Sequence, residues 1–94
     1  MNGDFESVHN VHEQAVFQAV LDALSDYPKL PPEIVADVAC VALNKLPPRY
    51  IRHAVDHAFF LTESERAAND AAIAEAVNAG FQFVLARNAM RARR

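Results

Sequence analysis

Apolar positions recur at helical spacing in the first third of the chain. A spacing of three and four residues places side chains on one face of a helix. Asn10 followed by Glu13 matches a capping box that would begin this helix. Pro28 disfavours helical backbone at the residue before it, so we expect the helix to end near Tyr27. Between residues 11 and 24 the stripe contains Val16, Val20, Ala23 and Leu24, with Phe17 and Leu21 beside it.

A second helix is predicted from Pro32 to Leu46, because Pro32 and Glu33 suit a first helical turn and Pro47 ends the segment. Almost every position within it is apolar. A helix that is apolar on nearly all sides is buried on nearly all sides, which in a small domain requires a second chain or a tightly wrapped neighbour. The only cysteine, Cys40, lies in this run, and we expect a buried free thiol.

After the proline pair, residues 49–52 alternate polar with aromatic or branched side chains, as a short strand would tolerate. Residues 49–61 could equally form a helix, and we favour a short extended start. Thr62 followed by Glu65 is a second capping box, which opens a long alanine-rich helix. Gly80 lies inside it, where glycine usually marks close packing against another backbone. The apolar stripe of this helix reads Ile73, Val77, Gly80, Phe81 and Val84.

These elements predict a mainly α domain of three to four helices over residues 1–94, with frayed ends at 1–9 and 88–94. A core this small indicates a homodimer. No apolar run is long enough to span a bilayer, so we expect a cytoplasmic protein without a membrane partner. Two glycines cannot build phosphate-cradling loops, and Ser7 near His9 lacks an oxyanion-forming turn. We therefore expect no catalytic residues and no enzyme.

The net charge of −3 is unevenly distributed. Residues 1–26 carry five acids and no lysine or arginine, whereas residues 87–94 carry four arginines and no acid. Overall acidity argues against nucleic acid as a partner, because nonspecific duplex affinity comes from neutralising phosphates. Local basic clusters remain compatible with a small anionic ligand.

Two histidine pairs have the helical spacing of metal ligands: His9 with His12, and His53 with His57. The Glu-x-x-His spacing of Glu6 and His9 occurs once, although di-iron bundles need it twice. Structural or surface histidines are the favoured interpretation, and no metal site is predicted.

The most informative polar residues lie between positions 37 and 52. Two of them project from one face of the apolar second helix, and three cations surround a tyrosine beside the rigid proline pair. Fixed cations and an aromatic plane suit a phosphate and a stacked base. The equally weighted alternative is that the aspartate pairs with Arg49 or caps the proline turn, while the tyrosine is core. The candidate ligand-binding residues are Asp37, Asn44, Lys45, Arg49, Tyr50 and Arg52.

The run D-V-A-C-V-A-L-N-K-L-P-P-R-Y at 37–50 resembles the signature of the ComFB family, named after late-competence proteins. The resemblance extends to Asn10-Val11-His12-Glu13 and to the closing helix through Val84. It implies a small dimeric helical receptor for cyclic dinucleotides, chiefly cyclic di-GMP and more loosely cyclic di-AMP. The matching polar and aromatic positions are Asp37, Asn44, Lys45, Arg49 and Tyr50.

Some members of that family carry zinc-binding cysteines before the Asp-Val pair, where this chain has Pro31, Pro32 and Val35. Cysteine-based zinc binding is therefore not expected. The leading hypothesis is a ligand-switched adaptor that acts on a downstream protein, with Arg49 and Lys45 on phosphates, Tyr50 on a base and Asp37 at a guanine edge. The alternative is a structural dimerisation module without ligand. A weak nucleic-acid adaptor using the arginine tail is disfavoured by the overall acidity.

Overall fold

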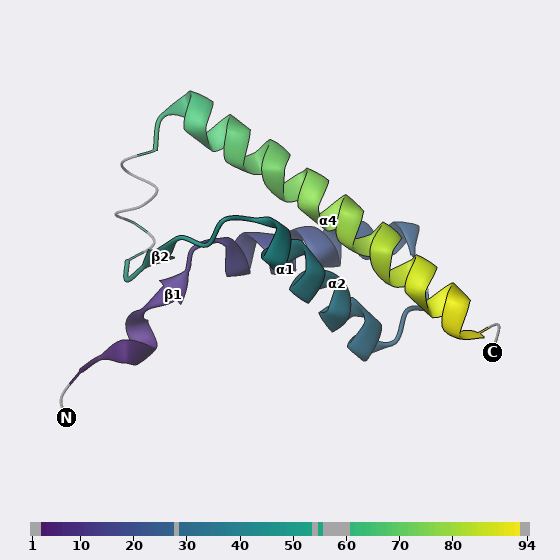
Figure 1. The fold of residues 1–94 in the computed structure, drawn as a ribbon. Coiled ribbons are helices and arrows are strands. Elements are labelled where there is room, and N and C mark those ends of the chain that lie inside the picture. The colour runs from purple at the N-terminus through teal and green to yellow at the C-terminus, as the bar shows by residue number, and fades with distance from the viewer. Residues whose placement is uncertain (1–2, 28, 54, 56–60, 93–94) are drawn as a thin grey trace.

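The computed structural model describes residues 3–27, 29–53, 55 and 61–92. Within them, three α-helices alternate with short extended and 3-10 segments (Figure 1). This arrangement confirms the predicted small, mainly α fold, including a short extended segment after the proline pair. The helices are α1 (His12–Ala23), α2 (Pro32–Lys45) and α4 (Glu63–Ala92); the strands are β1 (His9–Asn10) and β2 (Tyr50–Ile51); the 3-10 turns are η1 (Phe5–Ser7) and η2 (Leu24–Asp26).

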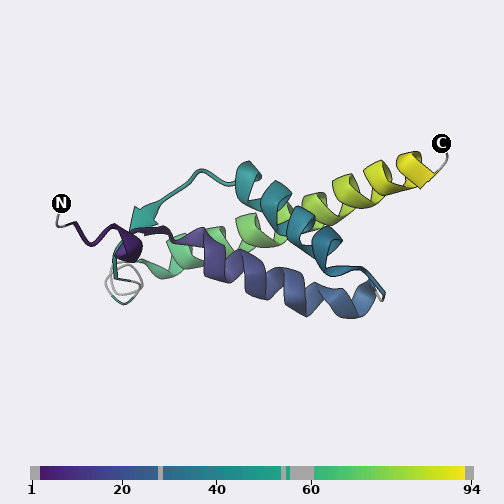
Figure 2. The same ribbon diagram turned by 90° about the horizontal axis from the view of Figure 1, so that it is seen from below.

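The core lies where α4 crosses the pair formed by α1 and α2. Figure 1 shows α4 above the pair, and Figure 2, seen from below, shows α1 and α2 in front of it. The predicted stripe of α4 is buried against both helices, which confirms that prediction. The buried core residues are Val16, Val20, Val38, Ala39, Ala42, Leu46, Ile73, Ala76, Val77, Phe81 and Val84.

Gly80 marks the closest approach of α4 to α2. A Cβ atom added at this position would lie 2.9 Å from the backbone oxygen of Val38 and 3.5 Å from the amide nitrogen of Ala42. Separations below 3.0 Å are essentially never seen for real Cβ atoms, and here the neighbour is backbone. The predicted close packing against another backbone is confirmed, and that backbone belongs to the same chain.

Two aromatic rings join the end of the first helix to the last one. The helix α1 gives way to η2, and Tyr27 follows at the predicted end of this segment. The Tyr27 ring stacks on the ring of Phe81, with centroids 4.2 Å apart and planes 6° from parallel. Offset aromatic pairs of this kind contribute stability beyond the area they bury.

The two predicted capping boxes have different outcomes. At α4, the Glu65 amide donates to the Thr62 hydroxyl at 3.1 Å and the Thr62 amide donates to the Glu65 carboxylate at 3.3 Å, so that box is confirmed. At α1 the prediction is wrong: the cap residue is Val11, without a side-chain hydrogen bond. Asn10 lies one residue before this cap. Its carboxamide oxygen accepts from the backbone amides of both His12 and Arg49.

The expectation that α2 is buried on nearly all sides is wrong for the single chain. Val38 and Ala42 point into the core, whereas Ala36 and Cys40 are exposed. The prediction of a buried Cys40 thiol fails for the same reason. Apolar composition does not reveal on which side of a helix its neighbours pack, and α4 covers only one side of α2.

The chain is extended for its size. Its radius of gyration is 15.5 Å, compared with about 12 Å for a compact domain of this length. The helix α4 continues to Ala92, past the predicted stripe, and η1 together with the first residue of β1, His9, lies within the N-terminal segment predicted to fray. Among the described residues, none of the helices has the length and apolar character needed to cross a membrane.

Candidate ligand-binding site

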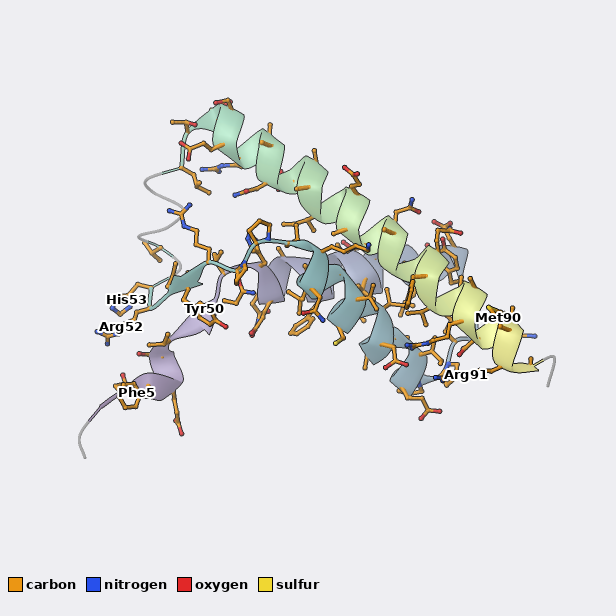
Figure 3. The ribbon with its side chains drawn as sticks, in the orientation of Figure 1. Phe5, Tyr50, Arg52, His53, Met90 and Arg91 are labelled. Carbon is orange, nitrogen blue, oxygen red and sulfur yellow. The ribbon has the colours of Figure 1, made fainter. Side chains whose placement is uncertain are left out.

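Four of the six predicted site residues follow one another along the chain from the last residue of α2 to just beyond β2. Lys45 is the last residue of α2, and the proline pair leads directly into β2. Figure 3 shows Tyr50 and Arg52 at the end of the molecule that carries the N-terminus, far from Met90 and Arg91 at the other end of α4. These four residues are Lys45, Arg49, Tyr50 and Arg52.

The backbone of Arg49 is held by the entrance to α1. Its amide donates to the Asn10 carboxamide oxygen at 3.2 Å, and its carbonyl accepts from the Val11 amide at 2.7 Å. The strands extend this contact as an antiparallel pair, with Asn10 opposite Tyr50 and His9 opposite Ile51. The guanidinium of Arg49 therefore projects from a fixed backbone, which reduces the entropy lost when it binds a ligand.

Two adjoining hollows open on either side of Pro47. The first is about 330 Å³ and includes Arg49 in its lining. The second is about 310 Å³ and includes Lys45. Both share Leu46, Pro47 and Ala72, so the two hollows adjoin and each carries one of the two cations; we call the pair the depression around Pro47. The first hollow is also lined by His12, Pro48 and Asn69, and the second by Glu75, Ala76 and Ala79.

The charges at this end are only partly neutralised. The side chains of Lys45 and Arg49 form no hydrogen bond or ion pair with the residues that the structure describes, and both are exposed. Arg52 is engaged, since its Nε donates to the Ser7 hydroxyl at 3.0 Å and its Nη2 lies 3.7 Å from a carboxylate oxygen of Asp4. Two unpaired cations thus remain for an anion.

Tyr50 is 67% exposed on β2, so the interpretation of this residue as core is wrong. Of the two equally weighted interpretations, stacking on a base and burial in the core, the exposure of the ring removes the second. Here β2 is a two-residue strand paired with β1 alone, and no further layer covers the ring among the described residues. The exposed ring is available for stacking, although Tyr50, like Arg52, is in the lining of neither hollow around Pro47.

Asp37 lies apart from the hollows around Pro47. Its carboxylate accepts from Nη2 of Arg87 at 3.3 Å, so the alternative in which it pairs with Arg49 is wrong. The Arg87 guanidinium also lies 5.7 Å from the centre of the Phe83 ring. Asn44 is exposed, and its amide nitrogen lies 3.7 Å from the Cys40 sulfur. Both Asp37 and Asn44 are absent from the linings of the two hollows around Pro47.

The histidines have separate surroundings. Nδ1 of His9 is 3.0 Å from the Ser7 carbonyl oxygen, and His12 lines the hollow next to Arg49. The pair of His53 and His57 cannot be assessed, because His57 lies outside the described residues. In the part of the chain that is described, no group of three or more histidine, cysteine, aspartate or glutamate side chains could hold a metal ion.

Sequence reasoning missed two residues of the hollow, His12 and Asn69. A signal for Asn69 exists: it precedes Ile73 by four positions and so continues the buried stripe of α4 towards its N-terminus with a carboxamide. A polar residue on an otherwise apolar stripe needs a partner or a ligand. His12 was considered only as half of a histidine pair.

Comparison with known proteins places the whole arrangement in one family. No curated protein matches the chain. The family model described as late competence development protein ComFB matches residues 9–88, which include β1, α1, α2, β2 and all but the last turn of α4. The chain belongs to the ComFB family.

Proposed function

We propose that this protein is a non-catalytic receptor for a cyclic dinucleotide, with cyclic di-GMP as the favoured ligand, and that it acts as a ligand-switched adaptor. The observation that carries the proposal is the pair of unpaired cations, Lys45 and Arg49, on a depression formed by two hollows of about 310 and 330 Å³. Small-molecule sites are commonly concave and of this size, with a few fixed polar groups.

Two cations of the lining and one aromatic residue that follows Arg49 on β2, outside the lining, match the parts of such a ligand. Arg49 and Lys45 supply charge-assisted hydrogen bonds to the two phosphates. The exposed ring of Tyr50 offers a stacking surface for a base. The two phosphates and the bases of one dinucleotide therefore have matching groups on one end of the molecule.

Glu75 is the acid on this depression, and it favours guanine over adenine. A carboxylate accepts from the two N–H groups on the Watson–Crick edge of guanine, whereas adenine presents an unprotonated ring nitrogen there. We assign to Glu75 the base-edge role that the sequence suggested for Asp37, because Asp37 is bound to Arg87. Asn69 can donate and accept beside it.

The test is a calorimetric titration with cyclic di-GMP and, separately, with cyclic di-AMP. We expect saturable binding of cyclic di-GMP, weaker binding of cyclic di-AMP, and a loss of about 10- to 100-fold in affinity for Arg49→Ala, since a hydrogen bond to a charged group is worth about 1.5–3 kcal/mol. Arg91→Ala is the matched control, because Arg91 is exposed at the opposite end of α4 (Figure 3).

Equal losses in the two arginine variants would indicate a nonspecific charge effect and would contradict the assigned site. Failure of the unaltered protein to bind either dinucleotide would reject the receptor proposal and favour the alternative, a structural dimerisation module.

A further inference from the structure

One histidine shares a hollow with Arg49. The hollow of about 330 Å³ is lined by His12, the first residue of α1, by Arg49, which precedes β2, and by Asn69 of α4. Lys45 lies on the adjoining hollow. The receptor proposal gives phosphate contacts to the two cations and leaves the half-buried imidazole of His12 without a role.

One carboxamide fixes the backbone of both His12 and Arg49. The side-chain oxygen of Asn10 accepts from the His12 amide at 3.2 Å and from the Arg49 amide at 3.2 Å. The Val11 amide also donates to the Arg49 carbonyl oxygen at 2.7 Å. The imidazole and the guanidinium therefore extend from two backbone segments that are tied together, so both can bind one ligand with little further loss of chain entropy.

The hollow holds no counter-ion for a protonated imidazole. Among the described residues, its lining contains Arg49 and no carboxylate. Glu13 follows His12 on α1, where successive side chains do not face each other. The charged side chains nearest to the hollow along α1 and α4 lie outside that lining; they are Glu13, Arg66, Asp70 and Glu75. An anion that enters the hollow thus supplies the negative charge that its lining lacks.

An imidazolium is a good phosphate ligand. Histidine is the side chain that ordinarily gains its charge between about pH 8 and pH 5, and its protonated ring has two N–H donors. A phosphodiester stays ionised throughout this range and accepts charge-assisted hydrogen bonds from such donors. A phosphate bound beside Arg49 therefore favours the protonated form of the His12 ring.

We propose that His12 is a further ligand-binding residue, which binds the same phosphate as Arg49 and takes up a proton when the cyclic dinucleotide binds. This inference rests on the receptor proposal. The proton comes from the solvent and stays on the imidazole while the ligand is bound. Because the complex holds more protons than the free protein and the free ligand, the affinity rises as the pH falls. The receptor then responds to pH as well as to the dinucleotide.

The test is a calorimetric titration with cyclic di-GMP at about pH 6 and about pH 8, on either side of the usual histidine range. We expect the unaltered protein to bind about five- to tenfold more tightly at the lower pH, since a shift of one pH unit in proton binding is worth about tenfold in affinity. His12→Gln keeps a donor but cannot be protonated. It should match the unaltered protein at the higher pH and lack the gain at the lower pH, with circular dichroism confirming its fold at both.

His53→Gln is the matched control, because His53 is exposed beyond β2 and lines neither hollow around Pro47 (Figure 3). This variant should keep the full pH dependence. Titrations at about pH 7 in two buffers of different ionisation enthalpy measure the proton uptake directly. We expect uptake of a fraction of a proton per ligand in the unaltered protein and in His53→Gln, and none in His12→Gln.

The outcomes separate this inference from the receptor proposal. Binding that does not depend on pH, or a pH dependence that His12→Gln retains, would overturn the role of His12 and leave the receptor proposal standing. Absence of binding by the unaltered protein at both pH values would reject the receptor proposal, and this inference with it.

Discussion

Phe81→Ala should lower the free energy of unfolding by about 3–5 kcal/mol, the usual cost of removing a buried aromatic ring. The Phe81 side chain is 1% exposed, lies in the core where α4 crosses the other helices, and stacks on Tyr27. A domain of this length is stabilised by roughly 5–15 kcal/mol in total. The substitution therefore removes a large share of the stability, and urea denaturation followed by circular dichroism measures it.

Phe83→Ala is the matched control for this prediction. It removes the same ring two positions further along α4, where the side chain is 54% exposed and contacts Arg87. An exposed cation–π contact is worth about 0.5–1 kcal/mol, so we expect a loss below about 1 kcal/mol. Similar losses in the two variants would contradict the description of the core.

Gly80→Val should destabilise the fold by about 3 kcal/mol, at the upper end of the usual cost of overpacking. The first added carbon would already lie 2.9 Å from the Val38 oxygen, and backbone cannot rotate away as a flexible side chain can. Gly80→Ala should cost less, because alanine regains about 1 kcal/mol of helix propensity.

Gln82→Val introduces the same side chain at an exposed position of α4 and serves as the control. We expect a loss of about 0.5 kcal/mol from helix propensity alone. In thermal and urea denaturation, we expect Gly80→Val to be the least stable of the three variants, Gly80→Ala to be intermediate and Gln82→Val to be the most stable. A Gly80→Ala protein more stable than the unaltered one would show that α2 and α4 have room to separate.

The features that could be predicted from the sequence are those that depend on neighbouring residues. The stripe of α4 and the capping box at Thr62 follow from spacings of three and four positions, and the structure contains both. Gly80 also predicted a close backbone contact, because glycine inside a long helix lowers helix stability and is usually present where close packing requires it.

The features that could not be predicted depend on contacts between distant parts of the chain. Asn10 was assigned to the cap of α1, yet its carboxamide also holds Arg49, 39 positions away. One alternative from the sequence pairs Asp37 with Arg49, whereas its partner in the structure is Arg87, 50 positions away. The apolar run predicts that Cys40 is buried, but the thiol is exposed because composition does not define which side of α2 meets α4.

The candidate site shows the same division. Lys45, Arg49 and Tyr50 could be grouped from the sequence, since a proline pair separates the first from the other two by a short, stiff connection. His12 and Asn69 join Arg49 in one hollow from α1 and α4 only through the crossing of the helices. Their contribution to the hollow therefore required the three-dimensional structure.

The most direct test of the proposed receptor follows backbone amide chemical shifts during titration with cyclic di-GMP. We expect the largest changes at Lys45, Arg49, His12 and Asn69 on the depression and at Tyr50 beside it, and we expect these changes to saturate. Unchanged shifts at high ligand concentration would contradict the receptor proposal. Changes concentrated at Phe17 and Leu21, which are exposed on α1 away from Arg49, would contradict the assigned site.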